Sequence, residues 1–263
     1  MTTKVPLETL PVDLIYDDGD PMDSPWHRSQ LNLLIEETQE RFRGRTDYYT
    51  GGDMFVYYSS KQAEAIKAEE AAERAWADAG RVGEPPKKTE FRGPDYFCVL
   101  DVDGRRRREG WGVWEEEGRY PDIIVEILSR STRKNDLGPK KKLYERTFRT
   151  REYICFDHVR DELVAWRLVD DEYQPIRPDV TGRIWSQVLG AFVGRWKGVY
   201  QGQDAAWLRL FDEAGNLIPI GLEIAESERE RADSERERAE SERERAEAAL
   251  AELERLRKLL GRE

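Results

Sequence analysis

PDIIVEILSRSTRKNDLGPKKKLY, residues 121–144, is the stretch around which the rest of the chain is organised. It begins with an apolar, β-branched run that carries one acid, Glu126, and this pattern between a proline and a serine predicts a buried central strand. A carboxylate inside such a strand is costly unless it is paired or holds a cation. After a turn rich in Ser and Thr, Asp136 opens a predicted helical segment that carries Lys140. Glu126 and Lys140 therefore form either part of a metal site or an ordinary buried ion pair.

A second acid is expected beside Glu126. Asp95 follows a proline and opens the predicted strand upstream. If the two strands are antiparallel neighbours, both carboxylates lie at one end of the sheet, where they repel unless they share a proton or a cation. A hard divalent cation takes oxygen ligands, and the carbonyl oxygen of Ile127 is a natural third ligand. Lys140 would then orient or activate a water molecule and offset phosphate charge. The alternative for Asp95 is a turn residue that caps its strand.

These parts suit phosphodiester hydrolysis, and they require no histidine. The chain has only two histidines, and we expect His27, on the first predicted helix, to be structural. Its two cysteines, Cys98 and Cys155, stand in separate apolar runs and are expected to be buried, reduced thiols. The absence of a CxxC motif or a Cys/His cluster argues against a structural zinc site.

The formal net charge of −11 does not by itself indicate a nucleic-acid partner. Local basic runs are the exception, and they supply the candidate DNA contacts Arg105, Arg106, Arg107, Arg130, Arg133 and Lys134. Arg105–Arg108 lies near two tryptophans, a combination that can bind nucleic acid, but a solvated hairpin tip is the alternative. The N-terminus lacks an apolar signal-peptide core and no apolar window is long enough to span a membrane, so we expect a soluble, cytoplasmic protein without a membrane partner.

The remaining pattern predicts strands with flanking helices. Residues 1–23 are expected to form an N-terminal arm, and residues 24–221 the globular domain. Ser24-Pro25 is a favourable start for a helix over 25–43. We predict a strand at 53–58, a surface helix at 60–79, and further strands at 96–101, 152–157, 162–168, 172–176, 182–185 and 206–210. The fold class is therefore α/β (α+β): a mixed sheet flanked by helices, followed by a long C-terminal helix.

The C-terminal part, residues 222–263, repeats every seven residues. SERERAD, SERERAE and SERERAE begin at Ser227, Ser234 and Ser241, so each heptad supplies one alanine to a seam that ends in Leu253 and Leu260. Alanine seams make weak coiled coils. We expect one long charged helix that forms a homodimer, if at all, through residues 250–260.

The motifs that surround Glu126 resemble the Uma2 family of candidate endonucleases, also known as domain of unknown function 820, within the PD-(D/E)xK nuclease superfamily. The resemblance extends over about residues 10–225 and rests on the order and spacing of Gly52–Phe55, Pro94-Asp95, Val125–Ser129, Asp136, Lys140, Tyr144, Glu152-Tyr153 and Asp157. Leu128 stands where the superfamily usually has its lysine. Lys140 would then be a migrated lysine, a substitution that the Uma2 pattern shares.

This resemblance implies a restriction-endonuclease-like sheet and Mg²⁺- or Mn²⁺-dependent hydrolysis of DNA. It implies that Asp95 and Glu126 are the metal acids, that Lys140 is the catalytic lysine, and that Asp53, Asp136 and Tyr144 support them. A second class of function is left open. The chain would then be a catalytically inactive nuclease fold, kept as a binding or scaffold module that assembles through its C-terminal helix.

Overall fold

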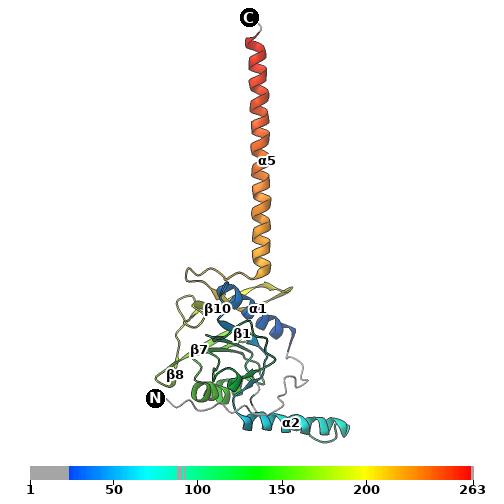
Figure 1. The fold of residues 1–263 in the computed structure, drawn as a ribbon, viewed down its shortest axis with the longest axis vertical. Helices are drawn as coiled ribbons and strands as arrows, with labels where there is room; N and C mark the ends of the chain where they lie inside the picture. Colours follow the sequence, from blue (N-terminus) through cyan, green and yellow to red (C-terminus); the bar gives the residue numbers. More distant parts are fainter. Residues whose placement is uncertain (1–23, 88–90, 92, 262–263) are drawn as a thin grey trace. The chain divides into compact units, whose positions relative to one another are not determined.

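The computed structural model describes residues 24–87, 91 and 93–261, with the side chains of 259 and 260 excepted, and its fold is drawn in Figure 1. The predicted arm, residues 1–23, lies outside the described residues. The chain divides into two compact units, Met1–Ile218 and Pro219–Glu263, and each is described by itself below.

The first unit is built on a six-stranded mixed sheet, as expected for the predicted fold class. Its neighbours β5 and β6 are parallel, and all its other pairs are antiparallel. In spatial order the strands are β1 (Tyr48–Gly52), β3 (Tyr96–Leu100), β5 (Ile123–Ile127), β6 (Glu152–Asp157), β7 (Glu162–Val169) and β8 (Glu172–Pro175). Every residue of β5 and β6 is buried. For β5, this burial was predicted from the apolar run in its sequence.

The register between β3 and β5 determines where the acids lie. Tyr96 pairs with Val125 in this antiparallel ladder, so the residue before Tyr96 and the residue after Val125 reach the same end of the two strands. These residues are Asp95 and Glu126, and their predicted proximity in the sheet is confirmed.

Helix α1 (Pro25–Arg41) begins as predicted, because the Ser24 side chain accepts a hydrogen bond from the His27 backbone N–H at 3.1 Å. It ends two residues before the predicted boundary. The helix packs on a second sheet of three strands, β9 (Ile184–Ser186), β10 (Ala191–Tyr200) and β11 (Gln203–Phe211). Gln30 hydrogen-bonds both backbone groups of Leu208, and buried Glu37 pairs with buried Arg209 at 2.6 Å. These contacts fix α1 against β11.

The sequence did not predict β10, and it predicted only the middle of β11. Gly194 and Gly198 interrupt the β10 segment, and glycine weakens a strand pattern. The hairpin partner stabilises the strand nonetheless, because all ten residues of β10 between Ala191 and Tyr200 pair with β9, β11 or both.

The predicted strand at 53–58 is wrong in its extent. Strand β1 ends at Gly52, Asp53 adopts a left-handed conformation with φ 49°, and only the short β2 (Val56–Tyr57) follows. Position 52 needs a glycine because a Cβ there would lie 2.7 Å from the carbonyl oxygen of Asp95. The Asp53 backbone N–H donates to that same oxygen, so Asp53 ties the end of β1 to the start of β3.

Two helical segments complete this unit. Helix α2 (Ser60–Asp78) matches the predicted surface helix within one residue. The segment after β5 becomes helical at Arg133, three residues before the predicted start, and it alternates α-helical and π-helical turns: α3 (Arg133–Asn135), η2 (Asp136–Lys140), α4 (Lys141–Leu143) and η3 (Tyr144–Phe148). Between β3 and β5 lie the short β4 (Trp111–Gly112), parallel to β2, and η1 (Val113–Glu115).

The second unit contains α5 (Gly221–Leu260), which Figure 1 shows as one continuous helix. The predicted long helix is thus confirmed. Within the part of the chain that the structure describes, no helix has the length and apolar character that a membrane span requires.

Candidate active site

Glu126 is the centre of the site. Its side chain is only 1% exposed, on buried strand β5. The Lys140 ammonium nitrogen Nζ lies 3.1 Å from Oε1 and 3.0 Å from Oε2, and the Tyr144 hydroxyl donates a hydrogen bond to Oε1 at 2.6 Å. Both carboxylate oxygens are therefore held by groups from the helical segment that follows the strand.

Asp95 reaches the same end of the sheet from the start of β3. Its Oδ2 accepts a hydrogen bond from the Ile127 backbone N–H at 2.6 Å, and its Oδ1 lies 3.5 Å from Nε2 of His27. The Asp95 side chain is 23% exposed, so this acid remains open to solvent while Glu126 does not.

Asp136 is a third carboxyl group at the site. It is buried, and its Oδ1 lies 3.2 Å from Lys140 Nζ, one turn further along the segment. That oxygen accepts no hydrogen bond from any described residue, although the ion pair is close. The backbone carbonyl of Asp136 accepts a hydrogen bond from the Tyr153 hydroxyl at 2.9 Å, which ties this turn to β6.

The electrostatics follow from three carboxyl groups arranged around one ammonium. Burial raises the pKa of Glu126 well above its ordinary value, and the charges of Asp95 and Asp136 add to the rise while Lys140 opposes it. Burial likewise raises the pKa of Asp136. The Lys140 pKa is raised even though burial would lower it, because the surrounding carboxylates stabilise the ammonium.

Asp95 behaves differently. Burial would raise its pKa, but the His27 contact and the Lys140 charge outweigh that effect and lower it. The surroundings therefore favour the ionised form of Asp95 and disfavour the ionised forms of Glu126 and Asp136. Among the described residues, the Lys140 ammonium and the His27 imidazole are the groups that oppose the charge of these three carboxyl groups, so carboxyl groups are in surplus.

Leu128, which stands in the usual place of the superfamily's lysine, is buried and 1% exposed. The ammonium comes instead from the helical segment, where Asp136, Lys140 and Tyr144 follow one another at intervals of four residues and share one face. Tertiary packing brings this face over the end of β5. The structure thus assembles the predicted trio Asp95, Glu126 and Lys140 in one place.

His27 also belongs to the site, although its sequence pattern indicated only a structural role. Its position on the first turn of α1 is fixed by the Ser24 cap, but its contact with Asp95 joins residues far apart in the chain. A histidine near the start of a capped helix was the only signal available in the sequence, and it does not indicate which strand the helix covers.

Within the described ranges, no three or more His, Cys, Asp or Glu side chains are clustered as a metal-binding group. The candidate oxygen ligands are therefore the two acids that the sequence predicted, Asp95 and Glu126, at the end of β3 and β5. Mg²⁺ sites in general use one or two carboxylates and keep several waters, so two acids are the least that such a site requires.

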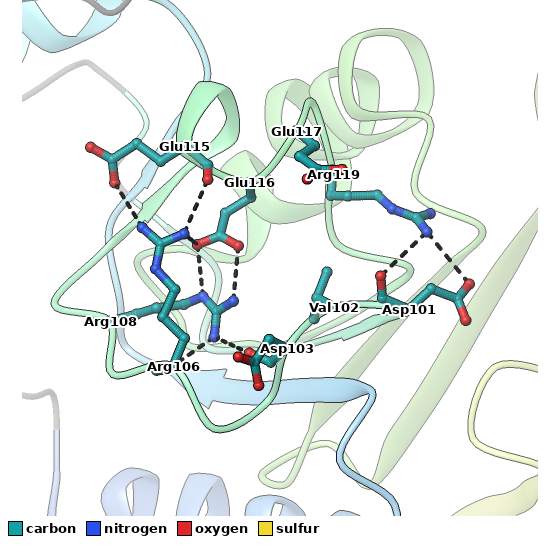
Figure 2. Close-up of a pocket in the computed structure, with 9 residues that line it drawn as sticks. All are labelled: Asp101, Val102, Asp103, Arg106, Arg108, Glu115, Glu116, Glu117 and Arg119. Atoms are coloured by element: carbon teal, nitrogen blue, oxygen red, sulfur yellow. Dashed lines mark hydrogen bonds and ion pairs between the residues drawn. The ribbon is translucent and has the colours of Figure 1, made fainter.

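In the arginine loop, residues 105–108, Arg106 and Arg108 are paired with acidic neighbours (Figure 2). Arg108 forms a two-pronged ion pair with buried Glu116 at 2.7 and 2.8 Å, and its guanidinium packs on the rings of Tyr49 and Trp111. Arg106 lies 3.4 Å from the same Glu116 carboxylate. Arg108 thus has a structural role.

The other predicted DNA contacts differ in the exposure of their side chains and in their pairing with acids. Arg105 and Arg107 are exposed and lie 3.7 and 3.9 Å from the acids Asp103 and Glu109. Arg133 is bound to two acids, Asp157 at 2.9 Å and Glu162 at 2.6 Å, and this pairing fixes its segment to the ends of β6 and β7. Arg130 and Lys134, on either side of Arg133, are exposed.

Fold and site together define a mixed α+β protein with a carboxylate–lysine cluster at the end of its central strands. Residues 10–194 match the Uma2 family, which is described as "Putative restriction endonuclease". The match spans more than half of the chain, and the chain belongs to the Uma2 family. A search of curated proteins found no match.

Proposed function

We propose that this protein is a metal-dependent DNA endonuclease that hydrolyses phosphodiester bonds at Asp95, Glu126 and Lys140. The observation that carries the proposal is the surplus of carboxyl groups over cations among the described residues at the end of β3 and β5, which a divalent cation would balance. The description of the Uma2 family supports the nuclease chemistry. We propose in addition that this family belongs to the PD-(D/E)xK nuclease superfamily.

Asp95, Glu126 and the Ile127 carbonyl would hold the cation, Mg²⁺ or Mn²⁺. When bound, such a cation supplies a Lewis acid for the phosphoryl oxygen and a water of lowered pKa. The buried Oδ1 of Asp136 lies 3.2 Å from the same Lys140 ammonium that Glu126 contacts, so two buried carboxyl groups share this one ammonium.

The chain's own residues would act as follows. Tyr144 and Lys140 hold the two oxygens of Glu126 in one orientation, and the Ile127 N–H does the same for one oxygen of Asp95. The Lys140 ammonium is the positive group that offsets the charge of a phosphate or orients the attacking water. Arg130 and Lys134, at the start of the same helical segment, are the exposed basic groups best placed in sequence to contact the DNA backbone.

Divalent-ion-dependent nicking of supercoiled plasmid is the expected result for the purified protein. We expect conversion to open-circular DNA with Mg²⁺ or Mn²⁺ and no conversion with EDTA, because the carboxylates alone provide no Lewis acid. Agarose gel electrophoresis measures the conversion, and calorimetric titration with Mn²⁺ measures binding independently. A protein that neither binds Mn²⁺ nor nicks DNA would contradict the proposal.

A non-catalytic binding module is the second candidate, and one observation favours it. The formal net charge is −11, which opposes the binding of a polyanion such as DNA. A protein that self-associates in light scattering but neither binds Mn²⁺ nor cleaves DNA would support this second function, an inactive scaffold that assembles through its C-terminal helix.

Replacing His27 tests whether it positions Asp95. We expect His27→Ala to weaken Mn²⁺ binding by about tenfold, as removal of a residue that orients a metal ligand commonly does, because the variant frees Oδ1 of Asp95 and removes a contact that lowers the pKa of this acid. Calorimetry at a fixed pH measures the change. The matched control is His158→Ala, which removes the histidine stacked on Trp26. Equal losses in both variants would show that His27 has no particular role.

A further inference from the structure

The turn that joins β6 to β7, residues 158–161, lies at the same end of the sheet as the acids. In the parallel ladder of β5 and β6, Glu126 pairs with Cys155, so β6 leaves the sheet beside the acids before the chain turns back. From Cys155 to His158 is three residues, or about 10 Å of extended chain. The β6–β7 turn therefore borders the candidate active site.

Hydrogen bonds to Asp157 fix the shape of this turn. Its Oδ1 accepts hydrogen bonds from the backbone N–H groups of Val159 at 3.2 Å and Arg160 at 2.9 Å, a pattern that Asp side chains commonly form in turns. Its Oδ2 accepts a hydrogen bond from Arg133, at the start of the helical segment that carries Lys140. The side chains of the turn are thus held in place beside the site.

His158, the first residue of the turn, ends a column of stacked aromatic rings. Its ring lies on Trp26, with 3.8 Å between the ring centroids and 22° between the planes. Trp26 in turn stacks on fully buried Trp207, at 5.4 Å and 22°. The neighbour of Trp26 is His27, whose ring reaches Asp95. The column therefore runs from the core to a partly exposed ring at the edge of the site.

No hydrogen bond within the described residues accounts for the placement of His158. Its Nδ1 is buried and has no hydrogen-bond partner there. Burial lowers the pKa of this imidazole, although the charge of Asp157 opposes the change, so the neutral ring is favoured near neutral pH. A neutral aromatic ring supported by an indole is suited to stacking, and proteins stack such rings on unpaired nucleobases.

The next two side chains of the turn supply the other contacts that a nucleotide uses. Val159 is 81% exposed, and the Arg160 side chain is 58% exposed, with its guanidinium 3.6 Å from Asp157. Backbone groups already fix the turn, so its shape requires neither side chain. An apolar surface and a cation beside an aromatic ring suit a base and its phosphate.

We propose that the β6–β7 turn is a nucleotide platform, on which His158, supported by Trp26, stacks an unpaired base of the DNA that the acids would cleave. Arg160 contacts a phosphate of the same strand. A base inside a duplex is already stacked on both faces, so the platform selects single-stranded or locally unpaired DNA. The inference rests on the proposed nuclease function, and it adds the class of substrate.

Fluorescence anisotropy tests the stacking. A short fluorescein-labelled single strand, or its blunt duplex, is titrated with the full chain in Ca²⁺, and a gel verifies that the DNA stays intact. We expect the wild type to bind the single strand more tightly than the duplex. His158→Ala should weaken single-strand binding by about fivefold to a hundredfold, as for the loss of one stacked base, and should change duplex binding by less than about twofold. His158→Phe should keep the wild-type affinity, because it retains a ring on Trp26.

Replacing Arg160 tests the phosphate contact. We expect Arg160→Gln to weaken DNA binding and to reduce the slope of log affinity against log salt concentration by about one. Arg149→Gln is the matched control. Arg149 is also exposed and paired with an acid, Asp171, but it precedes β6 and so lies at the opposite end of the sheet. Equal changes of slope in the two variants would contradict the contact.

The outcomes separate the platform from the nuclease function. Plasmid nicking together with equal affinity of the wild type for single strand and duplex would overturn the platform and leave the nuclease function standing. A selective loss of single-strand binding in His158→Ala, from a protein that does not nick, would support the platform and contradict catalysis. The platform is also overturned if the wild type binds neither DNA, or if His158→Phe loses as much affinity as His158→Ala while thermal unfolding shows both variants to be folded.

Discussion

Glu126→Gln is expected to lower the rate of Mn²⁺-dependent plasmid nicking by about a thousandfold or more, because it removes a carboxylate from the proposed metal site. The amide keeps the shape of the side chain and can still accept hydrogen bonds from Lys140 and Tyr144. Stability should therefore change by no more than about 1 kcal/mol. Burial already raises the pKa of Glu126, so a neutral group at this position costs the fold little.

The comparison needs nicking rates, Mn²⁺ calorimetry and a thermal unfolding curve on the same preparations. Glu172→Gln is the control, since Glu172 is an exposed acid on β8 of the same sheet. A variant that unfolds at the wild-type temperature but has lost both nicking and Mn²⁺ affinity would support the role of Glu126. Wild-type rates in Glu126→Gln would rule out this site as the source of any nuclease activity.

Lys140→Met should have the largest effect on stability. It leaves Glu126 and Asp136 buried without the ammonium that now lies 3.0 and 3.2 Å from them, and breaking a buried ion pair costs about 3–5 kcal/mol. We expect a loss of this order at pH 8 in the presence of EDTA. Urea unfolding followed by tryptophan fluorescence measures it.

The loss should be smaller at pH 5. Both carboxyl groups already have raised pKa values in the folded wild type, chiefly through burial, and removing Lys140 raises them further. A group with a raised folded pKa stabilises the protein below its unfolded pKa, and this contribution disappears as the pH rises through the folded pKa. Stability of the variant should therefore fall between pH 5 and pH 8 relative to wild type.

Lys142→Met is the control for this prediction, because Lys142 is an exposed lysine two residues along the same segment. It should change stability by less than about 0.5 kcal/mol at either pH. An equal loss in Lys140→Met at both pH values would show that the destabilisation comes from lost packing rather than from unbalanced charge.

The central strand and its acid could be predicted from local pattern alone. An apolar β-branched run predicts a strand buried on both faces, and all of Ile123–Ile127 is buried. Asp95 could be placed beside Glu126 because a single antiparallel pairing fixes which residues are opposite each other. Lys140 could be assigned to the site because its helical segment follows the strand directly.

Other features could not be predicted from the sequence because they depend on contacts between distant segments. Strand β10 contains two glycines and exists through its pairing with β9 and β11. Arginines 105–108 form a basic run in the sequence, but in the folded loop the charge of Arg108 is neutralised by Glu116. His27 reaches Asp95 only because α1 is packed across the sheet.

The sequence by itself therefore determined the mixed sheet, the strand that carries Glu126, the candidate trio and the long charged helix, since each depends on local periodicity or on one neighbouring pairing. Only the tertiary structure decided the surroundings of that trio. It placed Asp136 against Lys140, fixed both oxygens of Glu126 and brought His27 to Asp95. The balance of charge in a buried pocket depends on every group within a few ångströms, and that set is known only once distant segments have packed together.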